Sequence, residues 1–351
     1  MKTILITGGA GFIGANFVIH MLAKYPNYRI VNLDLLTYAA SYDVIKGLES
    51  HDNYHFVKGD IKDKALIEEL FKTYNITDVI HFAAESHVDN SIENPAVFLE
   101  TNIMGTFTLL NTAYRHWMDG PHKLKDAYKT ARFHHISTDE VYGTLGETGL
   151  FSEETAYAPN SPYSASKASS DFIVRAYAET YGLNTVITNC SNNYGPIQHT
   201  EKLIPKIIHN ALSGKDIPIY GTGENIRDWL FVLDHCRGID LAFHKGENGE
   251  NYNIGGRNER TNNEVVRTIC SLLDKKRPKS DGTSYKDQIN YVQDRAGHDM
   301  RYAIDATKIE NELGWKALEN FDTGIDKTID WYLAQIDTTQ ENKDVTTEKV
   351  A

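Results

Sequence analysis

The chain is poor in cysteine and has no long apolar run, and each shortage excludes a class of protein. Its 351 residues include three cysteines, Cys190, Cys236 and Cys270, which are far apart and lack metal-ligand spacing. An odd number of widely spaced thiols does not build a disulfide framework, so we expect reduced cysteines, no metal site and a cytoplasmic protein. No apolar stretch reaches the length that crosses a membrane. The N-terminal KTILIT enters a strand without a signal-peptide pattern.

Positive charge is scarce relative to negative charge. The sequence has 36 lysines and arginines against 48 aspartates and glutamates, which gives a net charge of −12. This balance argues against nucleic acid as a partner, and we expect no membrane partner either. It does not argue against a phosphorylated small molecule, because local glycines, helix ends and arginines decide that kind of binding.

Strand and helix patterns alternate through the first half of the chain. Short apolar runs with little alternation are typical of parallel strands covered on both faces. They occupy residues 3–7, 29–34, 55–59, 79–84, 132–137 and 185–189, with amphipathic segments such as 65–74 between them. The pattern predicts an α/β fold: a Rossmann-type doubly wound parallel sheet with a smaller, irregular C-terminal substrate domain.

A glycine-rich turn directly follows the first predicted strand. Gly8, Gly11 and Gly14 lie in TGGAGFIG before a helical run, and Asp34 ends the next strand, 20 residues beyond Gly14. Gly8 permits a tight turn, Gly11 lets the backbone approach a pyrophosphate, and Gly14 lets helix and strand pack closely. Asp34 can accept hydrogen bonds from a ribose diol and would repel a 2′-phosphate, which favours NAD over NADP. A glycine turn without a ligand is the alternative.

The next two strand ends offer further cofactor contacts. Asp60 and Ile61 end the third strand and could flank an adenine. Ala83 and Ala84, followed by Ser86, end the fourth strand, where small residues would let the backbone approach the cofactor. A solvated loop is the alternative at both places.

Tyr163 and Lys167 lie four residues apart in YSASKAS and so share one face of a predicted helix. A nearby ammonium favours the phenolate and lowers the pKa of a tyrosine. Tyr163 could then take a hydroxyl proton while hydride leaves the same carbon, and Lys167 could hold the nicotinamide ribose. For an isolated pair, a surface tyrosine with a solvated lysine is the alternative.

A hydroxyl and two carboxylates, Thr138, Asp139 and Glu140, follow the predicted strand 132–137. The carboxyl end of a strand in an α/β sheet is where ligands collect. A single dehydrogenase step needs only the hydroxyl, the tyrosine and the lysine, so the acidic pair indicates an enzyme that also removes a proton and expels a leaving group. The alternative is a helix N-terminus capped by Ser137 or Thr138.

These motifs resemble the extended short-chain dehydrogenase/reductase family. TGGAGFIG, YSASK and Thr138 carry that resemblance, and HISTDEVYG, NCSNNYGP, EKLIP and DRAGHDMRYAID resemble the dTDP-glucose 4,6-dehydratases within it. The resemblance runs from Lys2 to about Trp331. STDEVYG discriminates, because the similar 4-epimerases carry small residues in place of the acidic pair. Ala296 and Met300 depart from the pattern, in which proline and a polar or basic residue are usual.

The resemblance implies NAD-dependent dehydration of a nucleoside-diphosphate hexose, dTDP-glucose giving a 4-keto-6-deoxy sugar. Tyr163 would take the C4 hydroxyl proton as NAD⁺ takes the C4 hydride, and Glu140 would then remove the acidified C5 proton. Protonated Asp139 would donate its proton to the departing C6 oxygen, and Thr138 would hydrogen-bond the C4 oxygen. Burial and a neighbouring carboxylate both raise a carboxyl pKa, which suits Asp139. A 4-epimerase or decarboxylase, or a non-catalytic NAD-binding protein, are the alternatives.

The resemblance also implies two sets of binding residues and a homodimer. The cofactor set is Gly8, Gly11, Phe12, Ile13, Gly14, Asp34, Leu35, Thr37, Asp60, Ile61, Ala83, Ala84, Ser86, Thr101, Tyr163, Lys167 and Asn193. The substrate set is Ser86, Thr138, Asn192, Lys202, Leu203, Pro218, Ile219, Tyr220, Arg227, Asn262, Arg295 and His298. The forked guanidinium of an arginine suits diphosphate oxygens. The dimer would form through helices around residues 98–114 and after Tyr163.

We divide the chain into three parts. Residues 1–191 are the expected NAD-binding Rossmann domain, with a polar insertion at 118–130. Parts of 229–254, namely the strand-like 229–232 and 252–254, are expected to return to that domain. Residues 192–336 form a discontinuous sugar-nucleotide domain, and the polar residues 337–351 a disordered tail.

Overall fold

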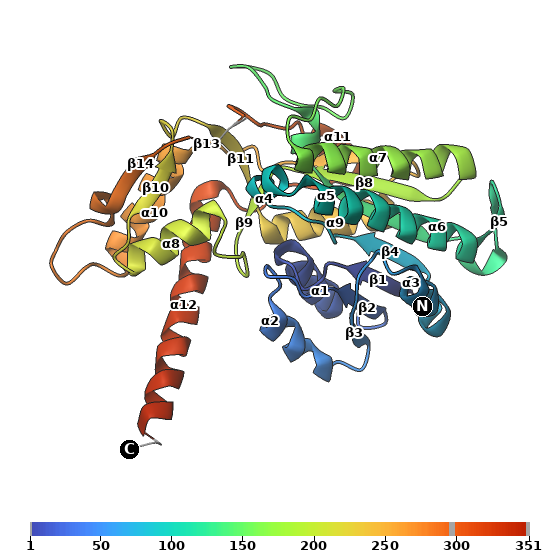
Figure 1. Ribbon diagram of the computed structural model, residues 1–351, viewed down its shortest axis with the longest axis horizontal. Coiled ribbons are helices and arrows are strands. Elements are labelled where there is room, and N and C mark those ends of the chain that lie inside the picture. The colour runs from blue at the N-terminus through green and yellow to red at the C-terminus, as the bar shows by residue number, and fades with distance from the viewer. Residues whose placement is uncertain (1, 295–298, 349–351) are drawn as a thin grey trace.

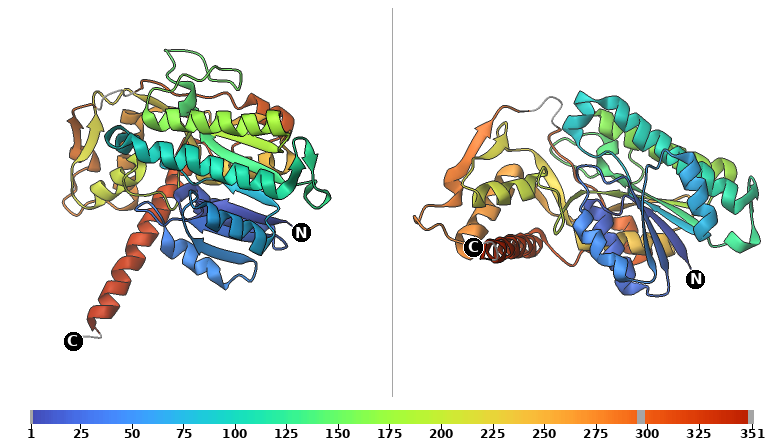
Figure 2. Two further views of the ribbon diagram at one scale, coloured as in Figure 1. Left: turned by 45° about the vertical axis from the view of Figure 1, so that its right-hand side comes forward. Right: turned by 60° about the horizontal axis from the view of Figure 1, so that its bottom comes forward.

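The computed structural model describes residues 2–294 and 299–348, and side-chain surroundings as far as Thr338. Arg295, Ala296 and His298 therefore lie outside the described residues. The molecule consists of a larger body built around one sheet, a smaller lobe beside it, and a long last helix that starts in the lobe and extends beyond it (Figures 1 and 2). No helix within the described ranges is both long and apolar enough to span a bilayer.

The body is built on a seven-stranded parallel sheet with the order β12-β8-β7-β4-β1-β2-β3. Its strands are β1 (Thr3–Thr7), β2 (Arg29–Asp34), β3 (Tyr54–Lys58), β4 (Asp78–His81), β7 (Arg132–Thr138), β8 (Thr185–Cys190) and β12 (Asn251–Ile254). The strand order reverses between β1 and β4, and ligands bind at that point outside the carboxyl ends of the strands. The predicted doubly wound fold is confirmed.

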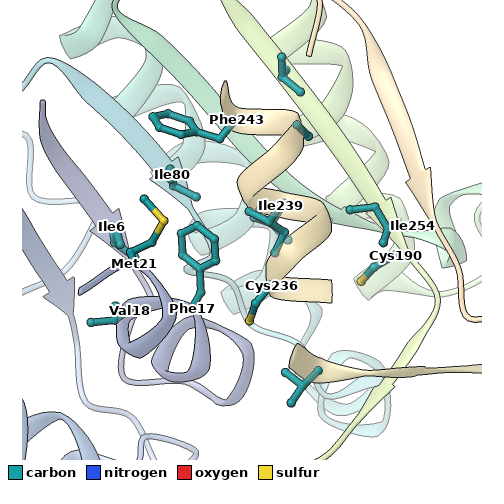
Figure 3. Close-up of a cluster of buried hydrophobic side chains, with 14 of the residues drawn as sticks. Ile6, Phe17, Val18, Met21, Ile80, Cys190, Cys236, Ile239, Phe243 and Ile254 are labelled. Atoms are coloured by element: carbon teal, nitrogen blue, oxygen red, sulfur yellow. The ribbon is translucent and has the colours of Figure 1, made fainter. Parts of the chain in front are cut away.

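Helices cover both faces of this sheet. One face carries α1 (Phe12–Lys24), α9 (Val232–Lys245) and α11 (Thr307–Leu313), and the other carries α3 (Lys64–Tyr74), α6 (Thr106–Trp117) and α7 (Pro162–Tyr181). Figure 3 shows Phe17 and Met21 of α1 with Ile239 and Phe243 of α9 in the first of these layers. Burying each such side chain contributes about 1.5–3 kcal/mol. Strands this apolar need cover on both sides, which explains the double winding.

Shorter elements connect the sheet strands. They are α2 (Tyr42–Lys46), η1 (Gly47–Ser50), α4 (Val88–Glu93), α5 (Pro95–Phe98), the π-helical segment η2 (Leu99–Gly105) and η3 (Asp126–Tyr128). The predicted insertion at 118–130 forms a small antiparallel hairpin, β5 (Met118–Gly120) with β6 (Lys123–Leu124). Segment η2 joins α5 to α6, and π-helical turns inside longer helices are frequent at functional sites.

The smaller lobe has its own sheets and its own apolar core. Strands β9 (Asn192–Tyr194), β11 (Ile226–Phe231) and β13 (Glu259–Thr261) form one sheet, and β10 (Ile217–Tyr220) pairs with β14 (Ile289–Val292). Helices α8 (Leu203–Leu212) and α10 (Asn262–Lys276), the turn η5 (Tyr285–Gln288) and the first turns of the last helix, with Phe321, Ile325 and Ile329, complete it.

Two expectations about the chain path differ in outcome. The run at 252–254 does return to the body, as β12 beside β8. The run at 229–231 belongs to β11 instead, which pairs with β9 and β13. Its Trp229 and Phe231 pack with Tyr194 in the core of the lobe. An apolar run predicts a strand, but it does not say which sheet that strand joins.

The last helix, α12 (Phe321–Glu348), includes residues 337–348, where the sequence predicts a disordered tail. Contacts with the lobe reach the start of this stretch, because Arg277, which directly follows α10, donates a hydrogen bond to Asp337 at 2.5 Å. A polar stretch without apolar periodicity can continue a helix that packing has already nucleated, since propagation costs far less than nucleation.

Candidate active site

A cleft opens at the carboxyl end of the sheet, beside the point where the strand order reverses. Every residue of the predicted cofactor set lines it. The five predicted catalytic residues, Thr138, Asp139, Glu140, Tyr163 and Lys167, line the same cleft. The structure thus places the glycine turn and the acidic pair, which lie more than a hundred residues apart in the chain, around one space.

The glycine turn has room for backbone only. Gly8 has φ +73°, and a Cβ there would lie 2.5 Å from the backbone nitrogen of Ala83. At Gly14 a Cβ would lie 2.2 Å from the carbonyl oxygen of Gly8. Gly11 precedes α1 without a side-chain cap, and Gly11, Phe12 and Ile13 line the cleft, so uncapped N–H groups at the helix start are available there for an anion. Gly9, which sequence reasoning missed, is equally constrained, since its Cβ would lie 2.2 Å from Asn32 Oδ1.

Asp34 is held in place by two backbone donors. The N–H of Ala10 donates to Oδ2 at 2.9 Å, and the N–H of Leu36 donates to Oδ1 at 2.8 Å. Burial raises the pKa of Asp34, and these two hydrogen bonds act against that rise. The glycine cradle and a carboxylate fixed at the end of β2 fit a dinucleotide with a free ribose diol, which is NAD.

The acidic pair lies at the end of β7, in the short 3-10 helix η4 (Asp139–Tyr142). The Thr138 hydroxyl accepts a hydrogen bond from the Glu140 N–H at 3.3 Å, so the helix-cap alternative and the cleft position both hold. Asp139 is 2% exposed, and its Oδ2 has no hydrogen-bond partner among the described residues. Glu140 is half-buried.

The environments of the two carboxylates differ in the way that acid and base roles require. Burial, followed by the charges of Glu140 and Asp228, raises the pKa of Asp139 well above its usual range. A raised pKa favours the protonated carboxyl group, which is the form that a general acid needs. The deeper burial of Asp139 therefore favours it as the proton holder of the pair.

Tyr163 and Lys167 lie in the first turns of α7, which begins at a capping box formed by Ser161 and Ser164. Both side chains are buried, with exposed fractions of 8% and 4%. The Lys167 ammonium donates to the carbonyl oxygen of Ile136 at 2.8 Å, on the strand that ends in the acidic pair. Burial lowers the pKa of Lys167 to about 8, while the charge of Asp171 opposes this.

The prediction that Lys167 lowers the pKa of Tyr163 differs from the structure. Burial, followed by the charge of Glu140, raises the pKa of Tyr163 well above its usual value. The i, i+4 spacing correctly places both residues on one helix face. It does not reveal the depth of burial or the approach of Glu140 from η4, which are the two largest causes of the raised pKa.

Several lining residues were missed by sequence reasoning. They include the polar or reactive side chains of Glu85, Cys190, Ser191, Gln198, His199 and Glu201. Glu85 is placed by Asn102 of η2, whose Oδ1 accepts its N–H at 2.8 Å. At the cleft mouth the Tyr38 hydroxyl donates a hydrogen bond to Oε1 of Glu201, at 3.4 Å. Cys190 and Ser191 lie in NCSNNYGP and Glu201 begins EKLIP, so these two motifs were a signal that could have found them. The other three lie outside the quoted motifs, and only the fold brings them to the cleft.

The predicted substrate residues divide into two groups. Ser86, Thr138, Asn192 and Lys202 line the cleft, whereas Leu203, Pro218, Ile219, Tyr220, Arg227 and Asn262 lie in the lobe outside the lining. The guanidinium of Arg227 donates to the carbonyl oxygen of Asp299 at 2.9 Å and stacks over Tyr302 at 4.4 Å. Arg295 and His298 lie outside the described residues. Substrate contact by the lobe residues stays a prediction.

The doubly wound sheet, the glycine cradle and the Tyr-Lys pair define a dinucleotide-dependent enzyme of the Rossmann class. Residues 5–328 match the family described as GDP-mannose 4,6 dehydratase. A dTDP-glucose 4,6-dehydratase of Xanthomonas campestris pv. campestris (strain B100) is 55% identical over 333 residues, 95% of this chain and 93% of that protein. One of Salmonella typhimurium is 55% identical over 340 residues, 94% of this chain and 92% of that protein. The chain therefore belongs to this 4,6-dehydratase family, as the motifs predicted.

Solved structures give the same picture. The dTDP-glucose 4,6-dehydratase of Bacillus anthracis, in complex with NAD, has a TM-score of 0.83 at 48% identity, covering 95% of this chain and 97% of that one. DesIV of Streptomyces venezuelae, with NAD bound, has a TM-score of 0.85 at 42% identity and the same coverage. The UDP-glucose 4-epimerase of Thermotoga maritima has a TM-score of 0.83 at 26% identity, covering 95% and 100%. The fold is thus shared with epimerases, and the site must distinguish them.

Proposed function

We propose that this protein catalyses the NAD-dependent 4,6-dehydration of dTDP-glucose to dTDP-4-keto-6-deoxyglucose and water, the hydro-lyase reaction EC 4.2.1.46. The observation that carries the proposal is the acidic pair Asp139 and Glu140 in one cleft with Tyr163 and Lys167. Relatives above 50% identity named dTDP-glucose 4,6-dehydratase support it.

The cofactor would be held by the glycine cradle and Asp34. The N-terminus of α1 suits the pyrophosphate, Asp34 suits the adenosine ribose diol, and Lys167 suits the nicotinamide ribose. When bound, NAD supplies the hydrogen acceptor for sugar C4 and the hydrogen donor for sugar C6. NAD in the Bacillus and Streptomyces relatives supports this choice.

Tyr163 and Thr138 serve the C4 oxygen in this proposal. Tyr163 removes the C4 hydroxyl proton as C4 is oxidised to a ketone, and the Thr138 hydroxyl hydrogen-bonds the same oxygen. This role requires the Lys167 ammonium and the positive charge of bound NAD⁺ to lower the Tyr163 pKa that burial and Glu140 raise. The ketone acidifies the neighbouring C5–H bond, because proton loss there gives an enolate. Oxidation at C4 thereby makes elimination at C5 and C6 accessible.

Glu140 and Asp139 act on the two neighbouring carbons. Glu140 takes the C5 proton, Asp139 gives its proton to the C6 oxygen, and the C6–O bond breaks to release water. After hydrogen returns to C6, Glu140 gives the proton back to C5. The proton that Tyr163 gains balances the proton that Asp139 loses, so one water leaves per cycle. The raised pKa of the buried Asp139 supports its role as the acid.

The alternatives make different products from the same fold. A 4-epimerase has no need for a buried acid beside a second carboxylate, so the acidic pair disfavours that activity. The alkaline absorbance of a 4-keto-6-deoxy product tests the proposal, and interconversion of dTDP-glucose with dTDP-galactose would contradict it. A kcat/KM comparison with UDP-glucose tests the thymine preference, which one methyl group controls.

A homodimer is the second part of the proposal. Large apolar side chains are exposed on one set of helices, namely Ile92 of α4, Leu99 and Met104 of η2, Phe107 of α6 and Phe172 of α7. The side chain of Phe172 is 58% exposed. Such a patch favours association between copies, and Phe172→Asp should shift the sedimentation coefficient to that of a monomer.

A cytoplasmic location is the third part of the proposal. The three buried, unpaired cysteines support it.

A further inference from the structure

A buried carboxylate without an assigned role lies behind Lys167. Asp171 follows it by one turn of α7 and is 2% exposed. Its Oδ2 accepts hydrogen bonds from the Ser137 hydroxyl at 2.7 Å and the Tyr157 hydroxyl at 3.0 Å. Asn189 of β8 also donates to it, at 3.5 Å. Burying a carboxylate costs free energy, and these three donors offset part of that cost. The group therefore needs an explanation in what it does for its partners.

These contacts connect Asp171 to the strand that carries the acidic pair. Ser137 directly precedes Thr138 in β7. Asn189, which donates to Asp171, also donates to the carbonyl oxygen of Thr138 at 3.1 Å. One carboxylate thus ties together α7 and the ends of β7 and β8. A shift of this carboxylate would move the backbone from which Asp139 and Glu140 project.

The other oxygen of Asp171 faces Lys167 through one imidazole. Nε2 of His135 lies 3.3 Å from Asp171 Oδ1 and 3.4 Å from Lys167 Nζ. Burial, followed by the charge of Lys167, lowers the pKa of His135 far below its usual value, so the ring is neutral. Asp171 and Lys167 thus both lie beside the same ring nitrogen, and the charge of Asp171 acts to keep the Lys167 ammonium protonated.

We propose that Asp171 is a positioning residue for the reaction, which fixes the end of β7 and keeps Lys167 in its charged form beside Tyr163. The proposal deepens the proposed function and rests on it for the role of Lys167. The groups that face Lys167 and Asp171 from the surrounding elements are His81 of β4, His135 of β7, Tyr142 of η4, Tyr157 of the loop before α7, Tyr163 of α7 itself and Cys190 of β8. None of these six groups is a carboxylate, so Asp171 supplies the negative charge beside Lys167.

The sign of its effect follows from the two pKa values. Burial lowers the pKa of Lys167 to about 8, and Asp171 acts against that fall. Burial raises the pKa of Asp171 to about 6, and Lys167 acts against that rise. Near neutral pH both groups are therefore charged. Removing the negative charge leaves burial unopposed, and the Lys167 ammonium then loses its proton at a lower pH.

Asp171→Asn tests this with little change of shape. In protein labelled with ¹³C at lysine Cε, the Lys167 resonance, assigned with Lys167→Met, should titrate about one pH unit or more lower in Asp171→Asn than in the unmodified protein. The alkaline limb of kcat should move by the same amount, with KM little changed. Asp240→Asn is the matched control, because Asp240 is a buried carboxylate paired with Lys24 at 2.5 Å between α9 and α1.

Asp240→Asn should lower the melting temperature without moving the Lys167 titration. An unchanged Lys167 midpoint in folded Asp171→Asn, or an equal shift in Asp240→Asn, overturns the proposal. The titration needs no substrate, so it separates two failures. If the midpoint shifts but the unmodified protein forms no 4-keto-6-deoxy sugar, the proposed function fails and the link between Asp171 and Lys167 stands.

Discussion

The carboxyl end of the sheet and the smaller lobe teach different lessons about how a site is assembled. At the sheet end, residues as distant as Gly8 and Lys167 line one cleft, because parallel strands bring their carboxyl ends to one edge. In the lobe, Tyr220 and Arg227 lie on two small sheets, outside that lining. A topological rule places the first group, whereas long-range packing alone places the second.

Asp139 and Glu140 at the sheet end and Arg227 in the lobe show this contrast most clearly, because the first two are assigned to chemistry and the third to binding. Replacing a group that reacts should abolish chemistry and leave binding intact. Replacing a lobe residue that binds should do the reverse. The following predictions test this division, beginning with the largest expected effect.

Glu140→Gln should lower product formation by about 10³–10⁴-fold, within the range of lost general-base catalysis. The variant should still bind NAD and exchange hydrogen at sugar C4, because Tyr163 and Lys167 are untouched. Single-turnover measurement of nicotinamide absorbance, beside product assay in alkali, checks both parts. Normal turnover would remove Glu140 from the role of C5 base.

Asp139→Asn should lower kcat by about 10²–10³-fold with KM little changed, because the departing C6 oxygen loses its proton donor. The raised pKa of Asp139 also predicts a sign for the pH profile. Asp139 works protonated, so in the unmodified protein kcat falls as pH rises through its pKa. The part of the alkaline limb that Asp139 sets should be absent in the variant, while the part that Lys167 sets remains. A pH profile of the same shape in both proteins would remove Asp139 from the alkaline limb.

Gly14→Ala should destabilise the protein by about 1–3 kcal/mol, because the new Cβ would lie 2.2 Å from a backbone oxygen of the cradle. Purified variant should also contain less NAD. Gly47→Ala is the control, since Gly47 has helical φ −61° and nothing within 4 Å of its Cβ position. Urea denaturation compares the two, and equal stability would show that the cradle tolerates a side chain.

Tyr220→Ala should have the smallest effect, raising KM for dTDP-glucose about tenfold with kcat unchanged, if the ring stacks on the base at about 1–3 kcal/mol. Tyr220 is 37% exposed, so the melting temperature should change little. Steady-state kinetics with dTDP-glucose checks this. Unchanged KM would place the base away from β10 and separate the lobe from substrate binding.

Sequence reasoning reached the fold and the cleft because their signals are local. Each signal depends only on residues that are neighbours in the sequence. The three are a glycine turn between strand and helix, an acidic residue at a strand end, and an i, i+4 pair. The protonation of Tyr163 could not be read this way, because burial and Glu140 act across the cleft. The sheet that β11 joins and the contacts of Arg227 with Asp299 and Tyr302 likewise depend on distant residues.

The most direct test of the account follows one hydrogen atom. Dehydration with internal return predicts that dTDP-glucose labelled with deuterium at C4 gives a 4-keto-6-deoxy product with the deuterium at C6, as NMR or mass spectrometry would show. Deuterium retained at C4 of the product sugar, with the C6 hydroxyl intact, would mean that the acidic pair beside Tyr163 does not perform elimination and would contradict the account.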